Sequence, residues 1–248
     1  MPDLKISVIT VCRNAETTIN ACISSVINQT YNNVEYIIID GASTDNTLAI
    51  IKKHESHVAV IVSEPDKGIY DAINKGIGLA TGDIIGVLNA DDFFSGPDVL
   101  YSIAAAFKAN MADVIYGDLD YVDKKGNVVR KWRSGKYKHG KFNRGWMPPH
   151  PTFYCRKELF EKFGNYSLVF GTAADYELMA RFIHLKQVPV YYLEMVLVKM
   201  TAGGVSNSSY KNRIKALYYD LKAMYNNEIN FPPFALMLKP LRKLKQFL

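Results

Sequence analysis

The sequence contains little cysteine. Its three cysteines, Cys12, Cys22 and Cys155, are odd in number and widely separated, and none belongs to a CxxC pair. This pattern supports neither a disulfide framework nor a zinc site. A reducing compartment fits it best, and we expect a cytoplasmic protein.

Long apolar runs are also missing. The nearest candidate is residues 188–200, VPVYYLEMVLVKM, but Glu194 and Lys199 interrupt it. It therefore falls short of the roughly 18 apolar residues that a membrane-spanning helix needs. The first residues lead directly into residues 4–12, LKISVITVC, without the basic segment, apolar run and cleavage site of a signal peptide. Internal repeats and low-complexity tracts are absent as well.

What the sequence does contain is an ordinary globular composition with an excess of positive charge. Its 248 residues are 48% hydrophobic and 22% charged, with a net charge of +6 and a pI near 9.0. This charge favours an anionic partner, such as a nucleic acid, a nucleotide, a phospholipid or a lipid-linked phosphate. The basic residues concentrate in residues 124–144 and 239–247, and solvated surface charge explains either cluster equally well.

Apolar, β-branched segments alternate with helical patterns over the first half of the chain. Strands are predicted at residues 4–12, 34–40, 58–63, 83–89 and 112–123, and helices at residues 19–27, 41–54, 68–80 and 97–109. This alternation predicts an α/β fold whose central, mostly parallel sheet carries helices on both faces. Ligands of such sheets bind beyond the carboxyl ends of the strands.

The pattern changes after about residue 115. A hairpin is expected around Lys125 and Gly126, then a strand and short helix in residues 147–164, and further helices at residues 172–185, 209–227 and 234–247. We predict a main domain of residues 1–205, with a ligand-binding half at 1–115 and a second half at 116–205. We expect residues 206–248 to form a C-terminal helical extension that can associate with a membrane.

Acidic residues follow two of the predicted strands. Asp91 and Asp92 lie near the end of the stretch IIGVLNADDFF, and Asp40 follows YIII. Adjacent carboxylates at the end of a buried strand repel each other, so a cation or several hydrogen-bond donors must compensate them. A hard divalent ion takes one or two carboxylates together with phosphate oxygens. The alternative is that Asp91 and Asp92 only form a turn or cap the next helix.

A third candidate segment precedes the helix at residues 68–80. Asp66, Lys67 and Gly68 lie in a loop where backbone N–H groups and a lysine can face an anion. Taken with SVITVCRN, IIIDGASTDNT, LNADD and GTAADYELMAR, this segment resembles the motifs of the family 2 glycosyltransferases of the GT-A fold. The resemblance covers residues 5 to about 200. These motifs are most similar to those of bacterial enzymes of surface-polysaccharide and colanic-acid-type assembly.

The resemblance implies an inverting transfer of one sugar from a nucleoside-diphosphate sugar, with UDP favoured over GDP, to an acceptor hydroxyl. The acceptor is expected to be a lipid-linked glycan, and the cofactor Mg²⁺ or Mn²⁺. The residues that match the donor-binding positions of the family are Thr10, Arg13, Asn14, Asp40, Asp66, Lys67, Asn89 and Asp91. Asp92 and Asp91 match the metal-binding element. Asn89 stands where the family often has Asp, which leaves open which of the two aspartates is the chief ligand.

Asp175 matches the catalytic base of the family. A carboxylate opposite the leaving group can take the proton of the incoming hydroxyl. Ala174 stands where the family often has Glu, so a helper carboxylate is absent or comes from Glu177. From its residues alone, Asp175 also fits a helix N-cap. His150 lies in a region that faces the acceptor or the metal in relatives, and a structural role is the alternative.

The C-terminal segment FPPFALMLKPLRKLKQFL places apolar residues on one helix face and Lys239, Arg242 and Lys243 largely on the other. This composition is typical of a helix at an anionic membrane surface. Packing on the domain or on a second subunit, as in a homodimer, explains it equally well. An enzyme at the inner face of the plasma membrane is the corresponding expectation.

Two other classes of function compete with this interpretation. A nucleotidyltransferase of sugar activation also uses carboxylates and a metal, but TVCRNAETT lacks the glycines of its N-terminal loop. A non-enzymatic nucleic-acid-binding domain explains the basic segments but leaves the acidic strand ends unexplained. We therefore expect no nucleic-acid partner.

Overall fold

The computed structural model describes residues 3–202, 210–244 and 246–247. Within these residues the strands form one sheet of nine, in the order β3-β2-β1-β4-β8-β6-β9-β5, with β7 paired to β6. The strands are β1 (Ile6–Cys12), β2 (Val34–Asp40), β3 (Val60–Ser63), β4 (Ile84–Val87), β5 (Asp92–Phe94), β6 (Val114–Val122), β7 (Val128–Trp132), β8 (Tyr154–Arg156) and β9 (Val190–Thr201).

The N-terminal half of the sheet is parallel. β1 pairs with β2 and β4, and β2 pairs with β3, all in parallel. The register sets Cys12 opposite Asp40, and Asp40 opposite Ser63. The C-terminal ends of β1 to β4 therefore lie along one border of the sheet, which we call the carboxyl edge. The predicted α/β fold is confirmed here.

The other half is mixed. β8 lies antiparallel between β4 and β6, whereas β6 and β9 run parallel. Because β8 runs opposite to β4, its N-terminal end is at the carboxyl edge. The preceding 3-10 segment, His150–Thr152, is therefore brought to that edge. The strand β5, which the sequence did not predict, pairs with the end of β9.

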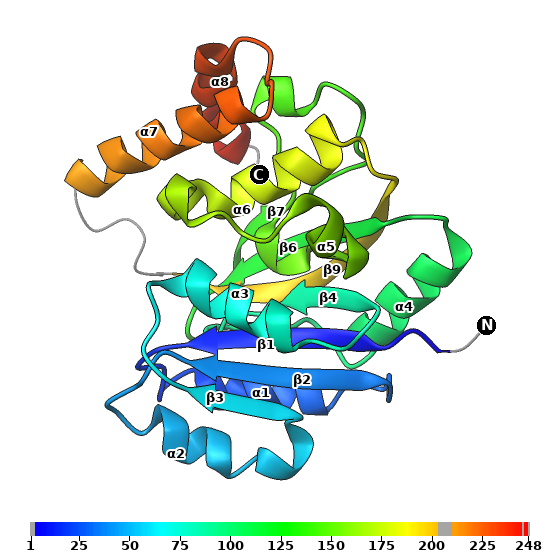
Figure 1. Ribbon diagram of the computed structural model, residues 1–248, viewed down its shortest axis with the longest axis vertical. Coiled ribbons are helices and arrows are strands. Elements are labelled where there is room, and N and C mark those ends of the chain that lie inside the picture. Colours follow the sequence, from blue (N-terminus) through cyan, green and yellow to red (C-terminus); the bar gives the residue numbers. More distant parts are fainter. Residues whose placement is uncertain (1–2, 203–209, 245, 248) are drawn as a thin grey trace.

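Helices cover both faces of the sheet (Figure 1). Ile9 and Val11 of β1 face the core beneath α3, α5 and α6, whereas Ile6 and Val8 face α1, α2 and α4. Because successive side chains of a strand alternate in direction, this buried strand is apolar on both faces. The helices are α1 (Ile19–Ile27), α2 (Thr47–Lys52), α3 (Ile69–Leu79), α4 (Val99–Ala109), α5 (Glu158–Phe163) and α6 (Ala174–Met179), which continues as a π-helical turn over Ala180–Leu185.

Two helices form the C-terminal extension, α7 (Tyr210–Asn226) and α8 (Pro232–Leu244). Both lie beyond α6, far from α1 and α2 (Figure 1). Gly145, in a left-handed conformation with φ 70°, lets α8 approach closely: a Cβ there would lie 2.5 Å from the carbonyl oxygen of Ala235. None of the helices in the described part of the chain is long and apolar enough to cross a membrane.

Candidate active site

Asp40 ends β2 at the carboxyl edge and is fully buried. Its carboxylate accepts hydrogen bonds from the Ser43 backbone N–H at 3.1 Å, from Ser63 Oγ at 2.6 Å and from Ser43 Oγ. Cys12 Sγ is a fourth donor at 3.6 Å. Protein donors therefore compensate this buried carboxylate, and it holds the loop after β2 in place.

Thr10 is buried within the core. It points toward α1, where its Oγ1 accepts a hydrogen bond from the Tyr36 hydroxyl at 3.1 Å and contacts Cys22 Sγ at 3.6 Å. Its side chain therefore does not line the surface of the carboxyl edge, unlike its neighbours Arg13 and Asn14, which are exposed.

Asn14 connects the loops that follow β1 and β2. It adopts the left-handed region at φ 51°, where asparagine is tolerated better than most residues. Its Oδ1 accepts the Thr44 N–H at 2.9 Å, and its own N–H donates to Ser43 Oγ at 2.8 Å. The exposed Arg13 is thereby presented next to the loop at the end of β2.

The third loop of this edge brings Asp66 and Lys67 to the same place. A Cβ on Gly41 would lie 2.3 Å from Asp66 Oδ2 and 3.6 Å from Arg13 Cβ, so these three residues are close neighbours. Asp66 Oδ1 accepts the Gly68 N–H at 2.8 Å, just before α3 begins. Lys67 is exposed. The sequence-predicted residues Arg13, Asn14, Asp66 and Lys67 are thus brought together.

The segment from Asn89 to Asp92 forms a turn after β4. The Asp92 N–H donates to the Asn89 carbonyl at 3.0 Å, and Asn89 Nδ2 donates to Asp92 Oδ2 at 3.2 Å. Thr201, at the end of β9, donates to the Asp91 carbonyl at 3.0 Å. Asp92 is fully buried, whereas Asp91 is partly exposed. Of the two carboxylates, Asp91 is the one that a ligand reaches directly.

This turn fits a divalent cation by the chemistry of its oxygens. Asp92 Oδ1 and Asn89 Oδ1 are buried, and no described residue forms a hydrogen bond with either atom. Burial, and next the charge of Asp91, raise the pKa of Asp92 well above its usual range. No group of three His, Cys, Asp or Glu side chains converges on a metal position among the described residues. Such a site suits an ion whose remaining ligands are phosphate oxygens and water.

Asp175 begins α6 and is partly exposed. Its Oδ1 accepts the Tyr176 N–H at 2.7 Å. Tyr70 of α3 stacks on Tyr166 with centroids 5.6 Å apart, and the Tyr166 hydroxyl lies 2.9 Å from His150 Nε2. Burial raises the pKa of Tyr70 and lowers that of His150, and in both cases the next influence is the negative charge of Asp175. Asp175 therefore lies close to both residues.

Tyr70 and Tyr166 are members of this group that sequence reasoning missed. They are far apart in the chain, and only the packing of α3 against residues 166–173 brings them together. The one local signal is the position of Tyr70 in the first turn of α3, next to Asp66 and Lys67.

Three further residues, among them the candidate helper Glu177, have structural roles. Trp146 is buried, and its Nε1 donates to the Ser134 carbonyl at 3.0 Å; Phe153 is buried as well. Glu177 is buried and forms an ion pair with Arg181 at 3.0 Å. Because its carboxylate is buried in this ion pair, Glu177 does not replace the helper carboxylate that is absent at position 174.

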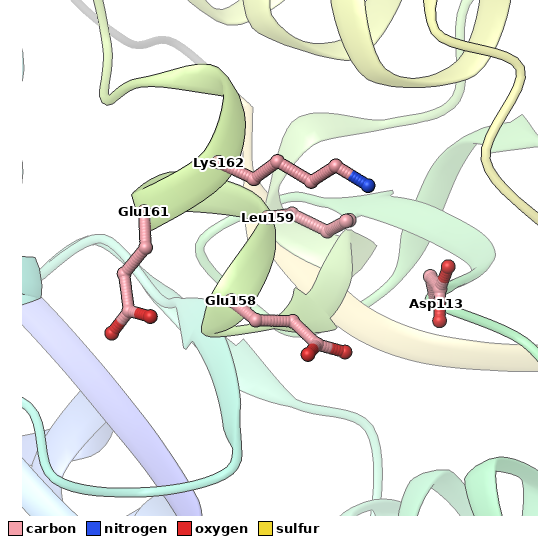
Figure 2. Close-up of a pocket in the computed structure, with 5 residues that line it drawn as sticks. All are labelled: Asp113, Glu158, Leu159, Glu161 and Lys162. Carbon is pink, nitrogen blue, oxygen red and sulfur yellow. The ribbon is translucent and has the colours of Figure 1, made fainter.

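A cavity of about 460 Å³ lies elsewhere, lined by Asp113, Glu158, Leu159, Glu161 and Lys162 (Figure 2). Asp113 immediately precedes β6, and its carbonyl accepts the Arg156 N–H at 2.9 Å. Since β6 runs parallel to β4 and begins here, this cavity is at the border opposite the carboxyl edge. It therefore contains none of the residues described above.

Residues 7–174 match the family described as glycosyl transferase family 2. This chain is a member of glycosyltransferase family 2. An uncharacterized glycosyltransferase of Mycobacterium tuberculosis H37Rv is 32% identical over 239 residues, 92% of this chain and 85% of that one. A PGL/p-HBAD biosynthesis glycosyltransferase of Mycobacterium bovis BCG is 30% identical over 209 residues, 82% of this chain and 79% of that one.

Solved structures show the same fold. TarS of S. aureus, residues 1–349 in complex with UDP-GlcNAc, has a TM-score of 0.70 at 18% identity, covering 98% of this chain and 73% of that one. The mannosyltransferase PcManGT of Pyrobaculum calidifontis, in complex with GDP-Man and Mn²⁺, has a TM-score of 0.68 at 17% identity, covering 96% and 70%. These likenesses show that the family 2 chain has the fold of the GT-A glycosyltransferases.

Proposed function

We propose that this enzyme transfers one sugar, with inversion, from a UDP-sugar to a hydroxyl of a lipid-linked glycan during bacterial surface-polysaccharide assembly of the colanic-acid type. A GDP-sugar is the second choice of donor. The observation that carries the proposal is that one sheet edge holds the exposed residues Arg13, Asn14 and Lys67, the partly exposed Asp66 and Asp91 and, across α3, Asp175.

The donor side is the part of the edge that a ligand can reach. Arg13 and Lys67 are cationic and exposed, which suits a diphosphate, and Asp66 is an acceptor for sugar or base N–H and O–H groups. Asp40 is buried, so we assign it the role of supporting the loop after β2, whereas Thr10 packs in the core against Tyr36 and Cys22. Asp40 is in addition our candidate for base recognition if Ser43 moves aside.

The acceptor side is built around Asp175. Its carboxylate accepts the proton of the incoming hydroxyl while that oxygen forms a bond to the anomeric carbon. The bond from this carbon to the diphosphate oxygen breaks, and the nucleoside diphosphate takes the electron pair. Attack from the face opposite the leaving group inverts the configuration. Tyr70 and His150 flank the carboxylate and fix its surroundings.

Asp91, with Asn89 and the buried Asp92 behind it, would hold the divalent cation. When bound, Mg²⁺ or Mn²⁺ offsets the negative charge that the departing diphosphate gains. The Mn²⁺ in the complex of PcManGT and the unpartnered oxygens of this turn both support the assignment.

The names of two relatives support the acceptor class. A protein of Escherichia coli, 33% identical over 133 residues that make up 53% of this chain and 52% of that one, is a UDP-Glc:alpha-D-GlcNAc-diphosphoundecaprenol beta-1,3-glucosyltransferase. The mycobacterial relative carries the name of PGL/p-HBAD biosynthesis. Both names fit a glycosyl acceptor attached to a lipid or a lipid precursor.

The test begins with a screen of nucleotide sugars for thermal stabilisation, which identifies the donor. Asp175→Asn should then bind that donor with unchanged affinity but lower kcat by about 10²- to 10⁴-fold. Asp113→Asn, at the opposite border of the sheet, serves as the matched control. Transfer retained in Asp175→Asn would remove Asp175 as the base, and a screen without any stabilising donor would contradict the donor site.

A further inference from the structure

Each of the two C-terminal helices exposes a row of apolar side chains. On α8, Phe234, Met237, Leu241 and Leu244 recur at the spacing of one helical face, and Met237 and Leu244 are 69% and 64% exposed. α7 adds a second exposed apolar row, formed by Ile214, Leu217, Tyr218 and Tyr225. We call these two rows the apolar face. Large apolar side chains gathered on exposed helix faces mark a candidate interaction site.

A group of cations lies beside α8. Arg242 Nε donates to the Arg144 carbonyl at 2.8 Å, which places the Arg242 guanidinium group at the junction of α8 with residues 142–145. We call Lys138, Lys141, Arg144 and Arg242 the basic cluster. No carboxylate within the described residues forms an ion pair with any of its members. Burial, and next the neighbouring cations, lower the pKa of Lys141 and Arg242, so these charges repel one another.

We propose that the apolar face and the basic cluster together bind the surface of an anionic lipid bilayer. Apolar side chains that enter the acyl boundary, with cations on the same helix and on the adjacent residues 138–144, are the composition that anionic lipid recognises. Membrane binding by this surface goes beyond the proposed function. It rests on that function in one respect only, because an acceptor attached to a lipid explains why the enzyme would need a membrane.

Charge argues against a second copy of the chain as the occupant. In a two-fold dimer the same surface meets itself, so one basic cluster would lie close to the other. With a net charge of +6 on each chain, such a contact costs electrostatic energy that anionic lipid would instead release.

The apolar face is joined to the catalytic side of the molecule. Lys239 of α8 pairs with Asp220 of α7 at 2.7 Å, and its Nζ lies 4.3 Å from the ring centroid of Tyr176, the residue after Asp175. α7 also contacts residues 168–173, which lead into α6; Lys222 Nζ donates to the Val169 carbonyl at 3.1 Å. Binding through α7 and α8 would bring Asp175 close to a bilayer that holds the acceptor.

The experiment is co-sedimentation of the full chain with vesicles of phosphatidylcholine containing phosphatidylglycerol, and with vesicles of phosphatidylcholine alone. We expect binding to the anionic vesicles, with affinity falling as salt is raised because the charges are screened. Absence of binding to anionic vesicles overturns the proposal. Equal binding to both vesicles overturns the role of the basic cluster.

Two double variants test the two parts of the surface. Met237→Gln with Leu241→Gln, and Arg144→Glu with Lys138→Glu, should each weaken vesicle binding about tenfold or more. Met237, Leu241, Arg144 and Lys138 are all exposed, so neither double variant should disturb the fold. Circular dichroism checks this.

Matched controls lie on the far side of the molecule. Met111→Gln removes a methionine that is 98% exposed, and Lys52→Glu with Lys53→Glu reverses two exposed charges at the end of α2. Both controls should leave vesicle binding within about twofold of the unaltered chain, because neither part of the surface changes. If the controls weaken binding as much as the two double variants, the proposed location is wrong.

Two further measurements separate the remaining outcomes. Light scattering that shows a dimer dissociated by Met237→Gln with Leu241→Gln would mean that a second copy covers the apolar face, and would overturn the proposal. Nucleotide binding, measured by calorimetry on the same variants, should be unchanged. A chain that binds vesicles but no nucleotide sugar would contradict the proposed function alone.

Discussion

Gly41 and Asp66 are in contact across the carboxyl edge: any Cβ on Gly41 would lie 2.3 Å from Asp66 Oδ2. Gly41→Ala therefore displaces the Asp66 carboxylate from its position beside Gly41 and Arg13. We expect UDP to bind about ten- to a hundredfold more weakly, the loss expected when a charge-assisted hydrogen bond is misplaced. Calorimetric titration with UDP measures this. Gly78→Ala is the control, since nothing lies within 4 Å of a Cβ there.

Asp91 and Asp92 should respond differently to loss of charge. Asp91 is partly exposed, so Asp91→Asn should leave the melting temperature unchanged yet abolish the gain in UDP affinity that Mn²⁺ provides. EDTA should have the same effect on the unaltered chain. Asp98→Asn, on the surface before α4, is the control. A Mn²⁺ effect that survives Asp91→Asn but not Asp92→Asn would make Asp92 the chief ligand.

The Tyr166 hydroxyl positions His150 beside Asp175. Tyr166→Phe removes the 2.9 Å contact to His150 Nε2 but keeps the stacking on Tyr70. We expect kcat to fall about tenfold while KM for the donor stays constant, because only the acceptor side is disturbed. Steady-state kinetics give both constants. Tyr31→Phe, which loses a hydrogen bond to the Leu4 carbonyl far from the site, should change neither.

Glu35 should make stability depend on acid pH. Although burial opposes it, hydrogen bonds from Lys5, Ser7 and Thr81 lower its pKa to about 2. The unfolded value is about 4.3, so the stabilisation is complete above that pH and is lost as the pH falls toward 2. Glu35→Gln should lower the free energy of unfolding at neutral pH by about 1–3 kcal/mol.

Urea denaturation at neutral pH and near the lower pKa measures this effect. The difference between Glu35→Gln and the unaltered chain should shrink as the solution becomes more acidic. Glu64→Gln is a control, because the pair of Glu64 with Lys75 is more exposed and contributes little. A difference that is constant with pH would mean that the charge of Glu35 contributes nothing.

The parallel half of the fold follows from local pattern. The predicted strands at residues 4–12 and 34–40 appear as Ile6–Cys12 and Val34–Asp40, because continuous β-branched runs fit only strands buried on both faces. The donor-side residues were predictable for the same reason, since each follows directly on a strand or precedes a helix. Their grouping needs no information beyond the order of parallel strands.

The remaining features depend on contacts between distant segments. The strand β5 exists only because Asp92, Phe93 and Phe94 pair with the end of β9. Three residues are too few to show the alternating hydrophobic pattern that predicts a strand. The burial of Asp40 and Asp92 likewise depends on residues distant in the sequence that pack over their side chains. Sequence reasoning placed both carboxylates at the correct edge but did not predict that each lies below the surface.

The cation of Lys239 lies over the ring of Tyr176, so α8 contacts the first turn of the helix that carries Asp175. Among the described residues, no hydrogen bond or ion pair joins the loops that carry Arg13, Asn14, Asp66 and Lys67 to α7 or α8. Loss of α8 by proteolysis or a late stop codon would consequently leave a protein that still binds a sugar nucleotide, while the helix of the proposed base Asp175 would lose its contact with Lys239. The two halves of the reaction thus differ in how much of the chain each requires.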